Sequence, residues 1–296
     1  MKKISPILLG LSLAVAGSSL AAAQQDATSP TAVPKVLQIT REFVKPGKGG
    51  ALHDRSESVF VQAMARAKWP THYMAMCSLT GKSRCLYITP YDSFAAWQKD
   101  TDSVAKDKTL SAELDKAEAA DGELLDSFDQ SVLRYDEDLS YHAAGDIAHA
   151  RYMEITEFHV RPGHGKDWSD LVKTVIATEQ KAGTNAHWAM FHMEYGGPGG
   201  TYLLFSSDKS MAEIDSGFAD GKKFAAAMGA DGMKKLDALV ASTVESTNQQ
   251  LFAFNPRQSY PPDAWVKEDP DFWKPNAAAP AMTMKKPAMT MKKAKP

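Results

Sequence analysis

Apolar and β-branched residues recur in two closely matching stretches, and each stretch ends in the same turn signal. The first stretch runs from Leu37 to Gly49, and the second runs from Met153 to Gly165, 116 residues later. In each, an apolar run reaches a basic residue and then Pro-Gly, which predicts a strand that stops at a turn before a helix. The match predicts that the chain is a duplication.

The first repeat is predicted to span residues 36–136. It opens with a strand at 36–44, and a helix follows that ends at Trp69-Pro70. Strands at 72–79 and 84–89, a helix capped by Asp92 or Ser93, charged helical material to about residue 127 and a strand at 132–135 complete it. The first helix is expected to bury a stripe at three- and four-residue spacing, made of Ala51, Leu52, Ser56, Val59, Phe60, Ala63, Met64 and Ala67.

The second repeat, residues 151–255, follows the same order after a linker at 137–150. It has a strand at 151–160, a helix near 168–181 that Gly183 ends, and a hairpin of strands 187–194 and 201–206. A helix capped by Ser210, another at 231–246 and a strand at 250–254 close it. Each repeat therefore reads β-α-β-β-α-β, the ferredoxin-like order, with an extra helix before the last strand. The predicted fold class is α+β.

These two halves resemble a known superfamily. Val-Lys-Pro-Gly at 44–47 and Asp-Ser-Phe-Ala-Ala-Trp at 92–97 make the chain similar to the dimeric α+β barrels over residues 36–136 and 151–255. This group includes antibiotic-biosynthesis monooxygenase-like, haem-degrading, EthD-like and NIPSNAP-like domains. The resemblance implies that the two ferredoxin-like repeats form an α+β barrel within one polypeptide, with internal pseudo-two-fold symmetry. A monomer is therefore expected.

The flanks of the repeats have a different composition. Residues 1–23 have the charged, apolar and small-residue regions of a secretory signal peptide, so we expect a periplasmic or secreted protein without a membrane span. Residues 24–35 are predicted to be a disordered lead-in. Residues 256–280 are rich in Pro and aromatic residues and predict an extended strap on the barrel exterior. Residues 281–296 are predicted to be a disordered Lys/Met tail.

The charge excludes one class of partner. Without residues 1–23 the chain has 32 basic and 36 acidic side chains, and five of the Lys residues lie in the tail. The two repeats are therefore acidic, whereas a nucleic-acid-binding domain needs a basic face. No nucleic-acid partner is expected.

The two cysteines, Cys77 and Cys85, lie eight residues apart across a turn that contains Gly81. In an exported protein this spacing favours a disulfide between paired strands, and the alternative is two buried thiols. The corresponding region of the second repeat has His192 and Tyr202. The disulfide would therefore link two strands of the first repeat and have no counterpart in the second.

Candidate ligand-binding residues follow from strand alternation. If Cys77 and Cys85 pair, His72 and Met74 share the opposite face of the sheet with Ile88. The resemblance to the haem-degrading members implies that Ile88 lines the barrel, and therefore that His72 and Met74 point into it. His187 begins the matching strand of the second repeat; the alternative for both histidines is that they cap a strand or bond to the linker. Nearby Arg41, Glu42 and Glu157 are expected to be solvated. The full candidate set for a cavity is His72, His187, Thr40, Thr156, Met74 and Phe205.

No cofactor or metal site is predicted. The haem-degrading members use an Asn, a Trp and a His, and the places that match these hold Thr40, Ile88 and Asp107 in the first repeat. His142, Asp146 and His149 have loose metal-like spacing but lack a fourth ligand. The two Met-x-Met pairs of the tail have thioethers that suit Cu(I), although a solvated basic tail is the simpler interpretation.

Three functions stay open. The first is an exported protein that binds a small apolar or aromatic molecule in the cleft between the two sheets. The alternative is a cofactor-independent monooxygenase-like enzyme that acts on a phenolic substrate. The second alternative is an envelope protein-interaction module with a filled barrel. The volume of the interior separates the last from the other two, because ligand pockets measure about 300 to 1,000 Å³.

Overall fold

The computed structural model of the chain describes residues 32–274. The predicted signal peptide, most of the lead-in, the end of the strap and the Lys/Met tail lie outside these residues. The elements, in chain order, are β1 Val36–Val44, α1 Ala51–Ala67, β2 Met74–Ser78, β3 Arg84–Tyr91, α2 Phe94–Lys106, α3 Lys108–Asp121, β4 Leu125–Tyr141, β5 Tyr152–Val160, α4 Gly165–Ala182, β6 Trp188–Tyr195, β7 Thr201–Asp208, α5 Met211–Met228, α6 Ala230–Thr243, β8 Val244–Phe254, α7 Asp263–Glu268 and α8 Pro270–Trp273.

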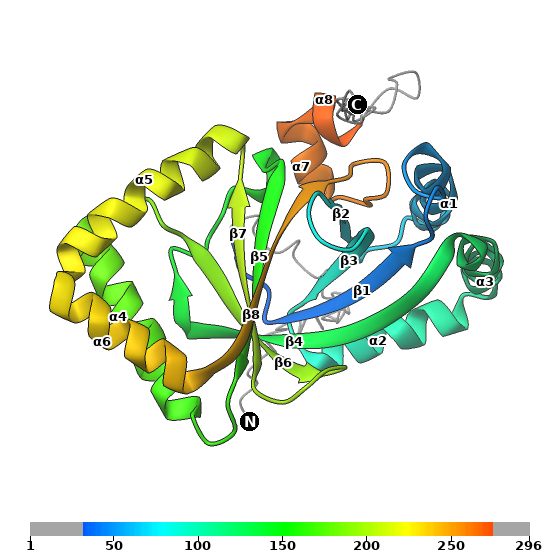
Figure 1. Cartoon of the computed structure of the whole chain (residues 1–296). Coiled ribbons are helices and arrows are strands. Elements are labelled where there is room, and N and C mark those ends of the chain that lie inside the picture. Colours follow the sequence, from blue (N-terminus) through cyan, green and yellow to red (C-terminus); the bar gives the residue numbers. More distant parts are fainter. Residues whose placement is uncertain (1–31, 275–296) are drawn as a thin grey trace, which may run out of the picture.

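The eight strands form one closed antiparallel barrel in the order β1-β3-β2-β8-β5-β7-β6-β4. Two seams join the halves of the chain: Met76 on β2 pairs with Phe254 on β8, and Leu133 on β4 pairs with Met193 on β6. Closure leaves no edge of this sheet unpaired within residues 32–274. The helices lie outside, with α1 to α3 on one side of the barrel and α4 to α6 on the other (Figure 1).

The barrel interior is a packed apolar core. Alternation sends every second side chain inward, and the largest buried cluster draws residues from all eight strands. Ile39, Met76, Leu133, Phe191 and Phe252 in this cluster have exposed fractions of 2% or less. Leu86 and Ile88 also belong to it and Met74 packs against it, so these strands have the facing that alternation predicts.

A disulfide joins Cys77 and Cys85, as predicted, and the two residues are cross-strand partners on β2 and β3. They lie on the outer face of the sheet, in a small cluster with Ala75, Tyr87 and Tyr73. This cluster sits beneath the helical layer of the first half. The disulfide is therefore part of the helix-facing side of the barrel.

Three local predictions were wrong. Helix α1 buries His53, Glu57 and Ala63, whereas Leu52 and Val59 of the predicted stripe are exposed. The strand predicted at 132–135 is the middle of the 17-residue β4, which reaches into the predicted linker.

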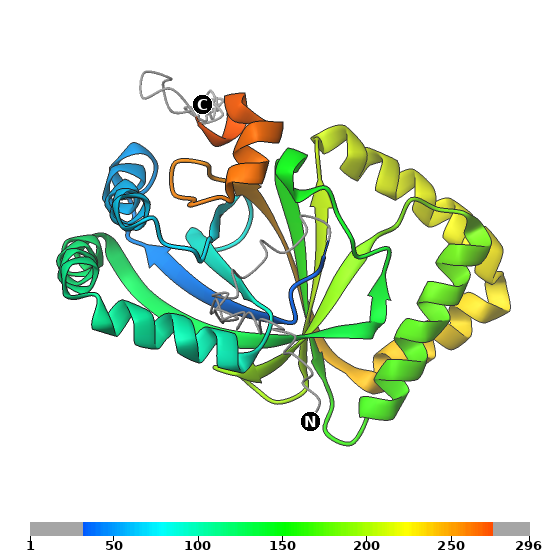
Figure 2. The same cartoon turned by 180° about the vertical axis from the view of Figure 1, so that it is seen from behind.

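The strap is not extended either, because α7 and α8 form within it (Figure 2). Trp273 at its end is 3% exposed and joins the interior cluster, and its Nε1 donates to the carbonyl of Ala148 at 2.8 Å. This segment therefore packs onto the interior core.

Candidate metal centre

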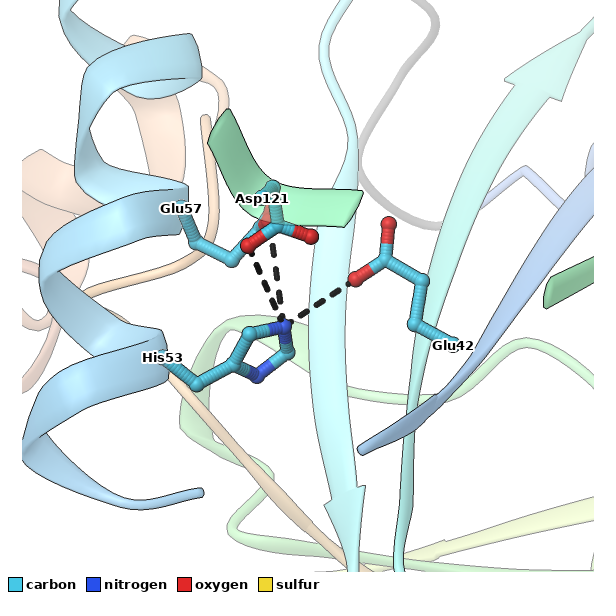
Figure 3. A group of neighbouring side chains, drawn as sticks. All are labelled: Glu42, His53, Glu57 and Asp121. Carbon is cyan, nitrogen blue, oxygen red and sulfur yellow. Dashed lines mark hydrogen bonds and ion pairs between the residues drawn. The ribbon is translucent and has the colours of Figure 1, made fainter. Parts of the chain in front are cut away.

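Four titratable side chains meet between the barrel and its first helix. Glu42 comes from β1, His53 and Glu57 come from α1, and Asp121 is the last residue of α3 (Figure 3). His53 and Glu57 share one helix face because they are four residues apart. Glu42 alternates with the interior residues Ile39 and Arg41 and so points outward to α1. The fold thus brings three carboxylates to one imidazole.

The three carboxylates converge on the Nε2 atom of His53. Glu42 Oε2 lies 3.2 Å from it, Asp121 Oδ1 lies 3.7 Å from it, and Glu57 Oε1 lies 3.9 Å from it. Two ligands that each lie about 2.1 Å from an ion are about 3.0 Å apart at a right angle, about 3.4 Å apart at the tetrahedral angle and about 4.2 Å apart when opposite. The observed separations fall in this range.

The group is buried and its charges are poorly compensated. His53, Glu57 and Asp121 are 1%, 3% and 2% exposed, whereas Glu42 keeps a larger contact with solvent. Among residues 32–274, no donor reaches Glu57 Oε1 or Asp121 Oδ1 while both carboxylates are ionised; a proton on Glu57 lets the two groups hydrogen-bond to each other. Burial, followed by the negative charges of Glu42 and Asp121, raises the pKa of Glu57 to about 10. Without an ion, the cluster therefore holds a proton on Glu57 at neutral pH.

A shell of polar residues surrounds the four. Gln258, which is 1% exposed, places its Nε2 atom 3.4 Å from Nδ1 of His53, and the same Nε2 donates to Asp54 Oδ1 at 3.0 Å. Its Oε1 accepts from the hydroxyl of Tyr87 at 3.0 Å. Tyr87 also hydrogen-bonds to Glu57. These bonds fix the orientation of the Gln258 amide beside His53. A metal ion on Nε2 would leave the proton of His53 on Nδ1, so the Gln258 amide would turn its oxygen toward the ring to accept that proton.

The second half of the chain fills the corresponding place with apolar side chains. Phe158 lies two residues before the end of β5, as Glu42 does on β1, and Trp168 lies near the start of α4, as His53 does on α1. The rings of Phe158 and Trp168 are 4.9 Å apart, and Trp168 is 2% exposed. Packing between this strand and helix thus needs no charge. The acidic cluster of the first half is an addition to the fold.

Three oxygen donors and one imidazole nitrogen suit a divalent ion. Carboxylates favour Mn²⁺ and related hard ions, and imidazole suits iron and zinc as well. An ion would supply the positive charge that the buried Glu57 and Asp121 oxygens lack. The chemistry of the donor set therefore fits a transition-metal ion.

Another group of acids and a histidine has a different character. His149 Nδ1 lies 2.8 Å from Asp146, and Glu268 is nearby. This group is largely exposed, and Lys209 Nζ already lies 2.8 Å from Asp146. His142 is not part of it, since its ring stacks on Tyr141 at 3.9 Å. A surface ion-pair network accounts for these contacts.

Of the candidate ligand-binding residues, His187 and Phe205 meet at one cavity, which has a volume of about 60 Å³. Its wall also includes Met153 and Ala189. The His187 ring is held by backbone carbonyls, with Nε2 2.8 Å from Ser207 O and Nδ1 3.1 Å from Asn185 O. The cavity is several-fold smaller than an ordinary ligand pocket.

The other four candidates lie elsewhere. His72 stacks on Tyr260 at 4.7 Å, under the segment that follows β8, and Met74 packs against the interior cluster. Thr40 and Thr156 alternate with interior residues and so face the helices; Thr40 Oγ1 accepts from Gln130 Nε2 at 3.3 Å. The structure therefore does not gather the six residues at one site.

The cluster is not predicted by the sequence pattern. Its strand position suggests that Glu42 is solvated, and the stripe of apolar residues suggests a buried face of α1 other than the one that carries His53 and Glu57. The available signal was the His-x-x-x-Glu spacing of residues 53 and 57 in a predicted helix. Asp121 gave no signal, since only folding brings α3 to this point.

An open groove of about 440 Å³ lies on the outer surface, between α5 and β8. Phe218 on its wall is 76% exposed. The groove is on the opposite half of the barrel from the cluster. Its lining consists of Thr80, Glu154, Ile214, Gly217, Phe218, Gln249, Gln250 and Leu251.

Solved structures share the barrel. A candidate monooxygenase from Fusobacterium nucleatum superposes with a TM-score of 0.50 at 12% identity, over 75% of this chain and 93% of that chain. The closed eight-stranded antiparallel barrel of this chain matches the fold of these dimeric α+β barrel neighbours. An anthrone oxidase-like protein follows with a TM-score of 0.48 at 11% identity, over 76% and 93% of the two chains. A mutant chlorite dismutase from Candidatus Nitrospira defluvii has a TM-score of 0.47 at 8% identity, over 80% and 96%.

At these identities the likeness concerns the fold alone. No protein-family model matches the chain, and no curated protein matches it in sequence. No helix among residues 32–274 is long and apolar enough to cross a membrane. The disulfide is compatible with an extracellular protein.

Proposed function

We propose that this protein binds one divalent transition-metal ion through Glu42, His53, Glu57 and Asp121. The observation that carries the proposal is the convergence of three carboxylates on Nε2 of His53, with two buried carboxylate oxygens that no donor reaches while both groups are ionised. Burial of such groups costs free energy unless a cation compensates them. A divalent metal ion is therefore the ligand that these three carboxylates and one imidazole are suited to bind.

The site is a closed one. Three of the four ligands have side chains that are at most 4% exposed, and Glu42 alone contacts solvent. An ion therefore enters and leaves past Glu42. A metal ion in a closed site holds together the strands and helices that supply its ligands, which here are β1, α1 and α3. We assign the ion a role in binding and in stabilising the first half of the barrel.

The experiment measures metal content and affinity. The chain without residues 1–23 is stripped with a chelator and titrated with Mn²⁺, Zn²⁺ and, under nitrogen, Fe²⁺, by calorimetry and by elemental analysis after dialysis. One equivalent of at least one ion is expected. Binding should also stabilise the chain against unfolding, by about 2.7 kcal/mol at a free ion concentration of 100 times Kd.

Variants locate the ion. Glu57→Gln and His53→Gln each remove one donor and should lower the affinity at least 100-fold. Glu113→Gln is the matched control, because Glu113 forms a surface ion pair with Arg66 and is distant from the ligands. Undiminished binding by both ligand variants, or no binding of any of the three ions, contradicts the proposal.

Binding of a small molecule between the sheets has less support. The cavity that His187 and Phe205 line holds about 60 Å³, and apolar side chains from all eight strands pack together in the barrel. A filled barrel favours the interaction-module alternative over a monooxygenase that uses the interior. The monooxygenase alternative rests on the likeness of fold alone.

Duplication and export belong to the proposal as well. The two halves have the same order of elements, from β1 to β4 and from β5 to β8, and this supports an origin by duplication. Secretion is supported by the disulfide, since disulfides persist in oxidising compartments.

A further inference from the structure

The Cys77–Cys85 disulfide lies against the residues that surround the metal ligands. The Sγ atom of Cys77 is 3.4 Å from Oε1 of Gln258, and the amide of Asn255 donates to the same sulfur at 3.8 Å. Gln258 in turn contacts Nδ1 of His53. A single side chain thus connects the disulfide to a metal ligand.

A second connection runs through β3. Tyr87 is two residues after Cys85 and lies on the same face of the sheet. Its hydroxyl contacts both Gln258 and Glu57. The position of Cys85 therefore sets the position of a residue that holds a second metal ligand.

The disulfide lies in a largely buried cluster. Cys85 is 5% exposed, Tyr87 is 9% exposed and its cross-strand partner Ala75 is fully buried, whereas Cys77 is partly buried. Two thiols cannot approach as closely as two bonded sulfurs. Reduction of the disulfide must therefore move Cys77, Cys85 or both. Because the surrounding side chains are closely packed, this movement also displaces Gln258 and Tyr87.

We propose that the Cys77–Cys85 disulfide controls the affinity of the metal centre, so that the oxidised chain binds the ion and the reduced chain releases it. This inference rests on the proposed function. The chemical step is thiol–disulfide exchange: a dithiol reductant gives two electrons and two protons to the S–S bond, yields the two Cys thiols and becomes a disulfide itself. In an exported protein, oxidation would thereby complete the site.

The size of the effect follows from the contacts. Loss of a partner that orients a metal ligand typically lowers affinity 10- to 100-fold. Linkage makes the coupling reciprocal, so the bound ion must favour the disulfide by the same factor. Because a tenfold change corresponds to about 30 mV for a two-electron couple, the ion should lower the reduction potential of the disulfide by about 30 to 60 mV.

The first test compares Mn²⁺ affinity in three forms of the chain: oxidised, reduced, and the double variant Cys77→Ala/Cys85→Ala. Mn²⁺ is suitable because it binds thiols weakly. The reduced chain and the double variant should bind 10- to 100-fold more weakly than the oxidised chain. If the double variant does not fold, the reduced wild-type chain still gives the comparison.

A matched control comes from the second half. His192 and Tyr202 are cross-strand partners on β6 and β7, as the two cysteines are on β2 and β3, and their rings lie 4.8 Å apart. The double variant His192→Ala/Tyr202→Phe removes this contact without touching the metal centre. Its Mn²⁺ affinity should match that of the wild type, so that a general loss of stability is separated from the proposed coupling.

The second test is the reciprocal one. The disulfide is equilibrated in dithiothreitol redox buffers with and without saturating Mn²⁺, and the thiols are trapped by alkylation. A potential that is unchanged by Mn²⁺, together with equal affinities of the oxidised and reduced chains, overturns this inference and leaves the proposed function intact. An oxidised chain that binds none of the three ions overturns both.

Discussion

The hydroxyl of Tyr87 donates to Oε1 of Gln258 at 3.0 Å and so ties β3 to the segment that follows β8. Tyr87 also contacts Glu57, whereas Gln258 contacts His53. One hydrogen bond therefore joins the supports of two metal ligands. Both residues are buried, with exposed fractions of 9% and 1%.

Removal of this hydroxyl should weaken metal binding without abolishing it. Tyr87→Phe keeps the ring in place and deletes both hydrogen bonds, so we expect a 10- to 100-fold loss of affinity with one equivalent still bound. Calorimetric titration measures both quantities. Tyr195→Phe is the control, because Tyr195 is 64% exposed and lies on β6. Equal affinities of the two variants would show that Tyr87 has no part in the site.

The stability of the ion-free chain should fall as pH rises. Burial and the neighbouring carboxylates raise the pKa of Glu57 from 4.5 to about 10. The folded chain therefore keeps a proton that the unfolded chain releases between these values. The stabilisation that comes from this proton is fully present below pH 4.5. As the pH rises above that value, the free energy of unfolding falls by up to about 1.4 kcal/mol per pH unit.

Urea unfolding at pH 5 and pH 8 in the presence of a chelator measures this slope. Glu57→Gln cannot ionise, so it should lose less stability than the wild type between the two pH values and be the more stable chain at pH 8. Glu113→Gln should follow the wild type. A wild-type slope no steeper than that of Glu57→Gln would refute the pKa assignment.

Metal affinity should rise with pH over the same range. An ion displaces the proton that Glu57 holds, so the apparent affinity is expected to increase up to about tenfold per pH unit between pH 5 and 9. Titrations in two buffers with different ionisation enthalpies count the protons released. About one proton per ion is expected at pH 7, and a pH-independent affinity would exclude Glu57 as a ligand.

The interior of the barrel should behave as a packed core. Phe191 is 2% exposed and its ring lies 5.5 Å from that of Phe205. Phe191→Ala should lower the free energy of unfolding by about 3 to 5 kcal/mol, because it leaves a cavity that the strands cannot close. Phe128→Ala, at a residue that is 60% exposed, should change it by less than about 0.5 kcal/mol. A small loss for Phe191→Ala would indicate a loosely filled interior.

The sequence by itself determined the order of elements and the facing of several strands. The alternation of Met74, Met76, Leu86 and Ile88 against the two cysteines requires only the two-residue period of a strand, and this period is local. The cap at Ser93 and the left-handed Gly183 at the end of α4 are also local, since each depends on the backbone of adjacent residues. The pairing of Cys77 with Cys85 depends on a short hairpin and is nearly local.

Only the tertiary structure decided which face of α1 is buried and what that face meets. Apolar residues such as Leu52 and Val59 suggested one stripe, yet the helix turns His53 and Glu57 inward, where they meet Glu42 and Asp121. Glu42 is 11 residues from His53, and Asp121 is 68 residues away. Their meeting depends on the closure of the barrel and the packing of α3, and no local pattern encodes it.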